Sequence, residues 1–337
     1  MLQIPKIVLV LTSALITFTG VSTFAADQDS LKEKYKRPLS IPFEGVTSYS
    51  PQLATLGKML FFDPRLSGAK NINCSSCHNP SFGYEVPVQT PVGAANVPLA
   101  RQAPTILNMA WVKPYFWDGR ADTLEAQAAG PIINPVEMNA KFEDVVKTLS
   151  GISDYDQWFD HLFPNKGVSE ETILTALATY QRTVVSGWSP FDRWVEGDES
   201  AISESAKRGF GLFNGKAKCA DCHSGWNFTD NKFHDIGLDT EDIGRGEFEP
   251  NNQKAKHAFK TPGLRNTTYR APFMHNGSLD NLEEVMAHYV SGGISRGSLS
   301  AKMSSLSISA TEQKDVIEFM RTLTADKQET PVPILPN

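Results

Sequence analysis

Two Cys-x-x-Cys-His sequences contain all four cysteines of this 337-residue chain. They are Cys74-Ser75-Ser76-Cys77-His78 and Cys219-Ala220-Asp221-Cys222-His223. At this spacing two thiols can form thioether bonds to the vinyl groups of a haem, and the histidine that follows can bind the iron from one side. A redox dithiol needs no such histidine, and a zinc site or two disulfides do not account for two complete copies of the motif. The motifs therefore predict two covalently bound c-type haems, with His78 and His223 as the proximal ligands.

The ligand on the opposite side of each iron decides the chemistry, because a strong ligand gives an electron-transfer haem and an open position lets peroxide bind. For the first haem, no histidine lies between His78 and His161, and the methionines nearby are Met109 and Met138. For the second haem the spacing leaves several candidates open, which are Met274, Met286, Met303, His234, His257, His275, His288 and Tyr289.

Helical patterns recur along the chain, and no stretch shows convincing strand alternation, so we predict a mainly α fold. The predicted helices lie at 52–61, 170–185, 203–213, 279–290 and 311–323. Ser50-Pro51 caps the first of them, and Ser309 with Glu312 forms a capping box before the last. Long loops rich in Pro, Gly and Asn occupy 79–105 and 224–265. Loops of this length in a compact protein are usually functional, and two haems would give them a body to pack on.

The chain divides most simply into two cytochrome c-like haem domains, at 26–195 and 196–325, followed by a tail at 326–337. Residues 1–25 have the features of a signal peptide: one positive charge, an apolar stretch and a small-residue cleavage region. We expect its removal on export to the periplasm, where c-type haem is found. No other segment approaches about 20 continuous apolar residues, so we expect no membrane span in the mature chain. The net charge of −6 argues against nucleic acid as a partner.

The sequence resembles the bacterial dihaem cytochrome c peroxidases, in order, from about residue 50 to 323. Besides both haem motifs, the matching segments are 101–105, 116–120, 130–131, 136–139, 264–266, 271–277 and 282–284. Ordinary members carry a histidine in the loop after the first motif, which caps the first haem until the second is reduced. The corresponding loop here, 90–98, has no histidine. The resemblance then implies a first haem that is open to peroxide without reductive activation.

A second departure concerns the axial methionine that follows the Leu-Glu-Glu motif at 282–284. In this sequence its place is taken by Tyr289, and Met286 and Met303 are the alternative ligands. Loss of the capping histidine together with a tyrosine ligand is the pattern of the MauG-type enzymes, which include the MbnH-like proteins. An anionic phenolate lowers the iron potential and favours high oxidation states, whereas a thioether raises it.

The resemblance also assigns roles in the space around the first haem. It implies that Glu137 is the acid/base that assists cleavage of the peroxide O–O bond. Pro131 matches a proline lining the same pocket, and Gln127 a nearby hydrogen-bonding residue. Trp117 matches the tryptophan placed between the haems, where an aromatic ring can relay charge.

Family members hold a structural calcium ion between the haems. The residues that correspond to its ligands are Gln102, where Asn is usual, Arg270, where Thr is common, and Pro272, which is kept. Backbone and amide oxygens suit calcium, so the resemblance implies a calcium ion here.

The resemblance to the MauG-type enzymes implies that hydrogen peroxide is used to oxidise a residue, tryptophan above all, of an exported partner protein. The alternative is a conventional peroxidase that takes electrons from a small redox protein such as a cytochrome c or a cupredoxin, and a third class is a dihaem electron carrier. MauG has a surface tryptophan six residues before its second haem histidine, but position 217 here is alanine. Trp226 is another possible exit for charge, and methylamine dehydrogenase is therefore not assigned as the partner.

Overall fold

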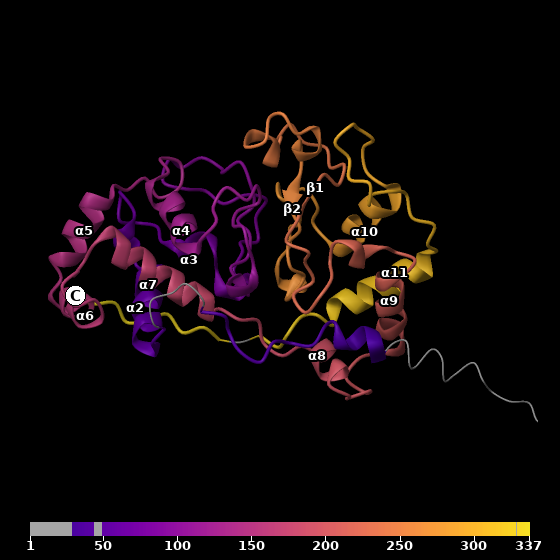
Figure 1. Ribbon diagram of the computed structural model, residues 1–337, viewed down its shortest axis with the longest axis horizontal. Coiled ribbons are helices and arrows are strands. Elements are labelled where there is room, and N and C mark those ends of the chain that lie inside the picture. The colour runs from indigo at the N-terminus through magenta and orange to yellow at the C-terminus, as the bar shows by residue number, and fades with distance from the viewer. Residues whose placement is uncertain (1–28, 44–48, 328) are drawn as a thin grey trace, which may run out of the picture.

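The computed structural model describes residues 29–43, 49–327 and 329–337, so the predicted signal peptide at 1–25 lies outside the described residues. The predicted mainly helical fold is confirmed (Figure 1). The helices in chain order are α2 (Pro51–Phe62), α3 (Cys74–Cys77), α4 (Leu124–Ile133), α5 (Phe142–Ser150), α6 (Ser153–Leu162), α7 (Glu170–Thr183), α8 (Pro190–Val195), α9 (Glu204–Asn214), α10 (Leu282–Ser291) and α11 (Ala310–Arg321). The short strands β1 (Phe233–His234) and β2 (Phe259–Lys260) pair antiparallel, with Phe233 opposite Lys260. Within these ranges no helix is both long and apolar enough to cross a membrane.

The five helices predicted from the sequence are present, and their capping residues act as expected. The Ser50 hydroxyl accepts a hydrogen bond from the Leu53 amide at 3.0 Å at the start of α2. Ser309 and Glu312 form the predicted reciprocal capping box at α11. The sequence patterns missed α3, α4, α5, α6 and α8. In α4 the cause is Pro131, which lies inside the helix although proline normally ends one.

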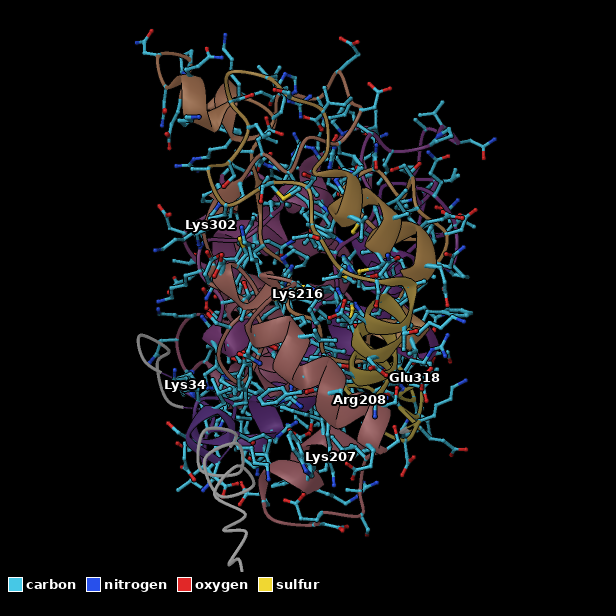
Figure 2. All side chains as sticks on the ribbon, turned by 90° about the vertical axis from the view of Figure 1, so that its right-hand side faces the viewer. Lys34, Lys207, Arg208, Lys216, Lys302 and Glu318 are labelled. Atoms are coloured by element: carbon cyan, nitrogen blue, oxygen red, sulfur yellow. The ribbon has the colours of Figure 1, made fainter. Side chains whose placement is uncertain are left out.

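The two larger hydrophobic cores of the described residues form around two pairs of packed helices. In the first core α2 packs on α7, and the buried residues come from positions 53–184. In the second core α9 packs on α11, around a cluster of aromatic rings that includes Phe191, Phe210, Phe228 and Phe319. Figure 2 looks onto this half of the molecule, where charged side chains such as Arg208 of α9 and Glu318 of α11 lie on the exposed surface.

The two terminal segments and α8 do not pack as a division of the chain at 195/196 would predict. Tyr35 is buried in the second core, and its hydroxyl donates to the Asn214 side chain at 2.6 Å. α8 also packs in the second core. Conversely, the C-terminal tail runs back under the molecule to the side of α2 and α6 (Figure 1), where Leu335 packs against the first core. The N-terminal segment and the tail thus each cross to the other half, and the two-domain division stays a prediction.

Gly209 lets the two main helices of the second core come close together. A Cβ atom at this position would lie 1.9 Å from the carbonyl oxygen of Asp315 in α11, and backbone atoms there cannot move aside as a side chain can. We expect Gly209→Ala to lower the free energy of unfolding by about 1–3 kcal/mol, as overpacking of a core does. Urea unfolding of the haem-loaded protein followed by circular dichroism measures the change.

Gly211 in the same helix is the matched control. It is exposed, and an added Cβ would meet nothing within 4 Å. Gly211→Ala should therefore be neutral or stabilising by up to about 1 kcal/mol, the helix-propensity difference between the two residues. Equal stabilities of the two variants would contradict the proposed close contact of α9 with α11.

Candidate haem-binding sites

Each Cys-x-x-Cys-His motif folds as one turn of helix. The first forms α3, which Asn73 opens with a capping box, and the second forms a 3-10 turn at Cys219–Asp221. In both motifs the histidine amide donates back to the carbonyl of the first cysteine, at 2.9 Å for His78 and 2.8 Å for His223. The turn therefore places two thiols and an imidazole on one short piece of backbone, and each motif lines its own pocket.

The two histidines have the same second contact. Nδ1 of His78 lies 3.3 Å from the carbonyl oxygen of Tyr84, and Nδ1 of His223 lies 2.9 Å from that of Phe228. Because a carbonyl only accepts, Nδ1 carries the proton and Nε2 is left with its lone pair for a metal. Burial lowers the pKa of both imidazoles, which keeps them neutral and able to bind iron.

The cysteines are unpaired, and their environment does not favour the free thiolate of a reactive dithiol. Burial raises the pKa of Cys74 and of Cys219 to about 12, and that of Cys77 to about 11. Redox-active and metal-binding cysteines instead have lowered pKa values that favour the thiolate. Buried thiols facing a large, mainly apolar pocket fit covalent attachment of haem.

The first pocket brings together all four residues that the sequence predicted around the first haem. Gln127 and Pro131 lie one turn apart on α4, and Glu137 follows in the turn after the helix. Trp117 closes another part of the wall. Among the described residues that line this pocket, His78 is the one histidine, and the loop at 90–98 contributes Pro91 and Gly93 in place of an imidazole.

Glu137 is held by its neighbours with its carboxylate at the pocket. One carboxylate oxygen accepts from the Asn134 side chain at 2.7 Å. Its backbone carbonyl accepts from the Ala94 amide at 2.6 Å, which fixes the 90–98 loop against this turn. Burial raises the pKa of Glu137 above its ordinary value, although the Asn134 hydrogen bond and the charge of Arg120 lower it. A carboxyl group with a raised pKa can exchange a proton nearer neutral pH than an ordinary glutamate can.

The second pocket contains Tyr289, which extends from α10 towards the attachment turn. Burial raises the pKa of its hydroxyl, and Cys219 and Cys222 line the same pocket. Among the described residues the phenol oxygen has no hydrogen-bond partner. Met286 and Met303 line the same pocket, so the choice of Tyr289 as a ligand stays a prediction.

Each histidine that spacing left open as a ligand has a contact through its ring. Nε2 of His288 lies 3.0 Å from the carbonyl oxygen of Ile236. His275 is buried and stacks on Phe259, with ring centroids 3.6 Å apart. Nδ1 of His257 lies 2.9 Å from the carbonyl oxygen of Asp242. His257 and His275 also line the second pocket, and a contact at one ring nitrogen leaves the other available, so these contacts do not select the ligand on the far side of the second haem.

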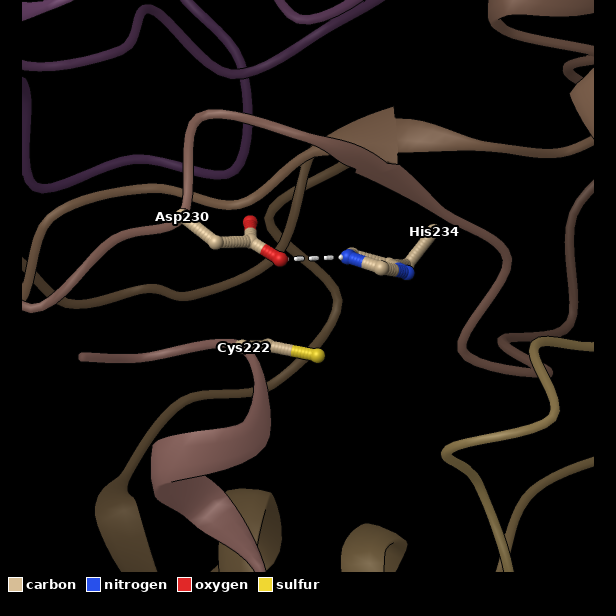
Figure 3. A group of neighbouring side chains, drawn as sticks. All are labelled: Cys222, Asp230 and His234. Carbon is tan, nitrogen blue, oxygen red and sulfur yellow. Dashed lines mark hydrogen bonds and ion pairs between the residues drawn. The ribbon is translucent and has the colours of Figure 1, made fainter.

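Cys222, Asp230 and His234 form a small cluster with metal-ligand spacing, because their ligand atoms lie within 4.8 Å of one another (Figure 3). Nε2 of His234 is 2.8 Å from the Asp230 carboxylate, and this contact, followed by that with Cys222, raises the pKa of His234 to about 9. The cluster is therefore an ion pair of Asp230 with His234 beside a haem-attachment cysteine.

Trp117 lies between the two pockets and lines both. Its indole Nε1 donates to the backbone carbonyl of Gln102 at 2.8 Å, and its own carbonyl accepts from the Lys260 amide at 2.8 Å. These bonds tie the ring to segments from both halves of the chain. The relay role that the resemblance implies for Trp117 stays a prediction.

Basic side chains around the pockets were missed by the sequence analysis. Lys260 lines both pockets, and burial lowers the pKa of its ammonium group to about 8. Arg101 lines the first pocket and pairs with Asp118 and Asp242. Such groups can compensate the carboxylates that every haem carries. Neither residue has a local sequence pattern that could have identified it.

Comparison with known proteins places the chain among dihaem enzymes. Residues 51–200 match the family model for di-haem cytochrome c peroxidase. The chain is 46% identical to methylamine utilization protein MauG of Methylorubrum extorquens, over 96% of this chain and 94% of that protein. It is 34% identical to cytochrome c551 peroxidase of Nitrosomonas europaea, over 88% and 86%. Its fold is similar to that of a MauG-like protein associated with microbial copper homeostasis, with a TM-score of 0.79, 29% identity, and coverage of 86% of this chain and 94% of that one.

Proposed function

The chain belongs to the di-haem cytochrome c peroxidase family, and we propose that it uses hydrogen peroxide to oxidise side chains, tryptophan above all, of an exported partner protein. The enzyme is MauG-like, since MauG is 46% identical over nearly the whole chain. The single observation that carries the protein-oxidising role is the pair of unlike pockets. One has His78 and no second histidine among its described lining residues, and the other has His223 together with Tyr289.

Two c-type haems are implied by the family, and the residues present fit them. Cys74 and Cys77 would hold the first haem, with His78 as its proximal ligand. Cys219 and Cys222 would hold the second, with His223 as its proximal ligand. When bound, the two irons supply redox centres that accept and pass on the oxidising power of peroxide. The neutral imidazoles and the buried thiols described above support this assignment.

Glu137 is the proposed proton carrier at the first site. One of its carboxylate oxygens is held by Asn134. The other has no hydrogen-bond partner among the described residues, and it can take a proton from one peroxide oxygen and return it to the other. Gln127 and Pro131 line the pocket beside it, where they restrict the position of the small substrate.

Trp117 and Tyr289 are the proposed groups that connect the two sites. Trp117 lines both pockets, so its ring offers a route for charge between them. An anionic phenolate at the second site would favour storage of an oxidising equivalent over acceptance of an electron. A partner residue could then be oxidised at the surface without entering either pocket.

The proposed compartment is the periplasm, because haem is attached to such motifs outside the cytoplasm and residues 1–25 have the pattern of a signal peptide. The partner is then an exported protein. The names of the relatives point to different partner systems, one to methylamine utilization and one to copper homeostasis. The proposal therefore names a class of partner, an exported protein, and no individual partner.

A peroxide titration of the fully oxidised protein tests the proposal. We expect the ferric enzyme to react with about one equivalent of hydrogen peroxide, with spectral changes at both haems and no prior reduction. The 34% identical cytochrome c551 peroxidase makes the conventional reaction the alternative. A ferric protein that ignores peroxide, and responds only after one-electron reduction, would show that this alternative is correct.

A further inference from the structure

The region between the two pockets is bridged by a group of buried polar side chains. Gln102, Trp117 and Arg270 each line both pockets. Gln102 and Arg270 are also the positions at which family resemblance predicts a calcium ion. A calcium ion needs oxygen ligands that are free to point at it. The hydrogen bonds of Gln102 and Arg270 therefore decide whether these residues fit a cation.

The Gln102 side chain presents its amide nitrogen to the carbonyl oxygens that a cation would need. Nε2 donates to the carbonyl of Val86 at 3.1 Å and to that of Pro272 at 3.4 Å. The amide oxygen instead accepts from the Ala103 backbone at 3.0 Å. Turning the amide round would set its nitrogen against a backbone N–H and its oxygen against two carbonyls. The amide N–H groups of Gln102 thus bind the carbonyl oxygens that a calcium ion would otherwise bind.

Arg270 adds a fixed positive charge to the same region. Its guanidinium contacts the Glu85 carboxylate, with Nη2 to Oε1 at 2.9 Å, and both side chains are buried. Nη1 donates to the carbonyls of Gly263 at 2.7 Å and Arg265 at 3.0 Å. A divalent cation would have to displace these donors, and the Glu85 carboxylate that could attract it is already paired with the guanidinium. The residues present do not fit calcium.

We propose that this enzyme joins its two haem sites without calcium, through the Arg270–Glu85 ion pair and the Gln102 amide. The same bridge positions Trp117, because the backbone carbonyl of Gln102 accepts the indole N–H at 2.8 Å. The backbone amide of Gln102 donates to the carbonyl of His275 at 2.7 Å, which extends the bridge to the second half of the chain. Arg270 and Glu85 are positioning residues, and they act on the haems through the segments that they hold.

The calcium content of the haem-loaded enzyme tests the proposal directly and does not depend on the reaction with peroxide. We expect well under one calcium ion per chain by plasma mass spectrometry after dialysis. Treatment with EGTA should leave the optical and electron paramagnetic resonance spectra of both haems unchanged. One tightly held calcium ion per chain, or a spectrum that changes on chelation and recovers with added calcium, would overturn the proposal.

Variants of the ion pair test the positioning role. Arg270→Gln leaves the Glu85 charge buried and unpaired, and should shift the resonance spectra of both haems. Adding Glu85→Gln gives two amides that can bond to each other, and should restore most of the original spectrum. Arg208→Gln removes an exposed guanidinium from its ion pair with Asp315 and is the control. An unchanged spectrum in Arg270→Gln, or a double variant as perturbed as the single one, would refute the positioning role.

Discussion

Replacing Glu137 by glutamine is expected to slow the reaction of the ferric enzyme with hydrogen peroxide by about 10²–10⁴-fold, the usual contribution of a positioned acid/base group. Glutamine keeps the size of the side chain and can keep the hydrogen bond to Asn134, but it cannot take up and release the proton. Stopped-flow absorbance at the haem bands, over a range of peroxide concentrations, gives the second-order rate constant. The ferric resting spectrum should stay as it is, because Glu137 is not a proposed iron ligand.

The pH profile separates proton transfer from a simple change of shape. The pKa of Glu137 is raised by burial, and the carboxylate form is the one that accepts a proton from peroxide. The rate should therefore fall as the pH drops through this raised pKa, at a higher pH than an ordinary glutamate would give. The glutamine variant should lack this step in its profile.

Glu143→Gln is the matched control for Glu137→Gln. Glu143 is an exposed residue of the first turn of α5, and it does not line the first pocket. Its replacement should leave the rate constant and the pH profile unaltered. A Glu137→Gln enzyme that reacts as fast as the wild type would exclude Glu137 as the acid/base. Proton transfer would then have to use another group, such as solvent near Gln127.

The haem sites could be predicted from the sequence where their chemistry is local. Each attachment site is five consecutive residues, and one helical turn is enough to set two thiols and an imidazole together. The capping residues of α2 and α11 were predictable for the same reason, since a cap involves residues three positions apart. Resemblance to a family supplied Glu137, Trp117 and Tyr289, because no spacing rule connects them to the motifs.

The groups between the pockets could not be predicted, because they meet only through the tertiary fold. Glu85 and Arg270 are 185 positions apart, and nothing near either residue marks it as part of a buried pair. The sequence around Lys260 gives no sign of a special role. Only in the folded protein does β2 place its ammonium group over the ring of Tyr115, where the residue lines both pockets. Helix α4 was not predicted either, because a proline normally ends a helix, whereas Pro131 lies within this one.

Replacing Tyr289 by phenylalanine is the second change with a large expected effect. If the phenolate binds the second iron, its loss should raise the reduction potential of that haem by tenths of a volt, since the choice of axial ligand spans about 0.8 V. Burial raises the pKa of the free phenol, so ionisation needs a cation to offset it, and a ferric iron supplies that charge. Redox titration and resonance spectra of the two haems measure the change. The first haem should keep its spectrum.

Three further variants decide between Tyr289 and its competitors. Met286→Leu and Met303→Leu remove two of the thioethers that line the same pocket, and neither should shift the potential of the second haem. Tyr269→Phe removes a phenol in the same half of the chain that donates to the carbonyl of Ala325, and it controls for loss of a hydroxyl alone. A shift in either methionine variant, combined with no shift in Tyr289→Phe, would assign a thioether to the second iron. The enzyme would then have the ligand of an electron-accepting haem, and oxidation of a partner protein would lose its physical basis.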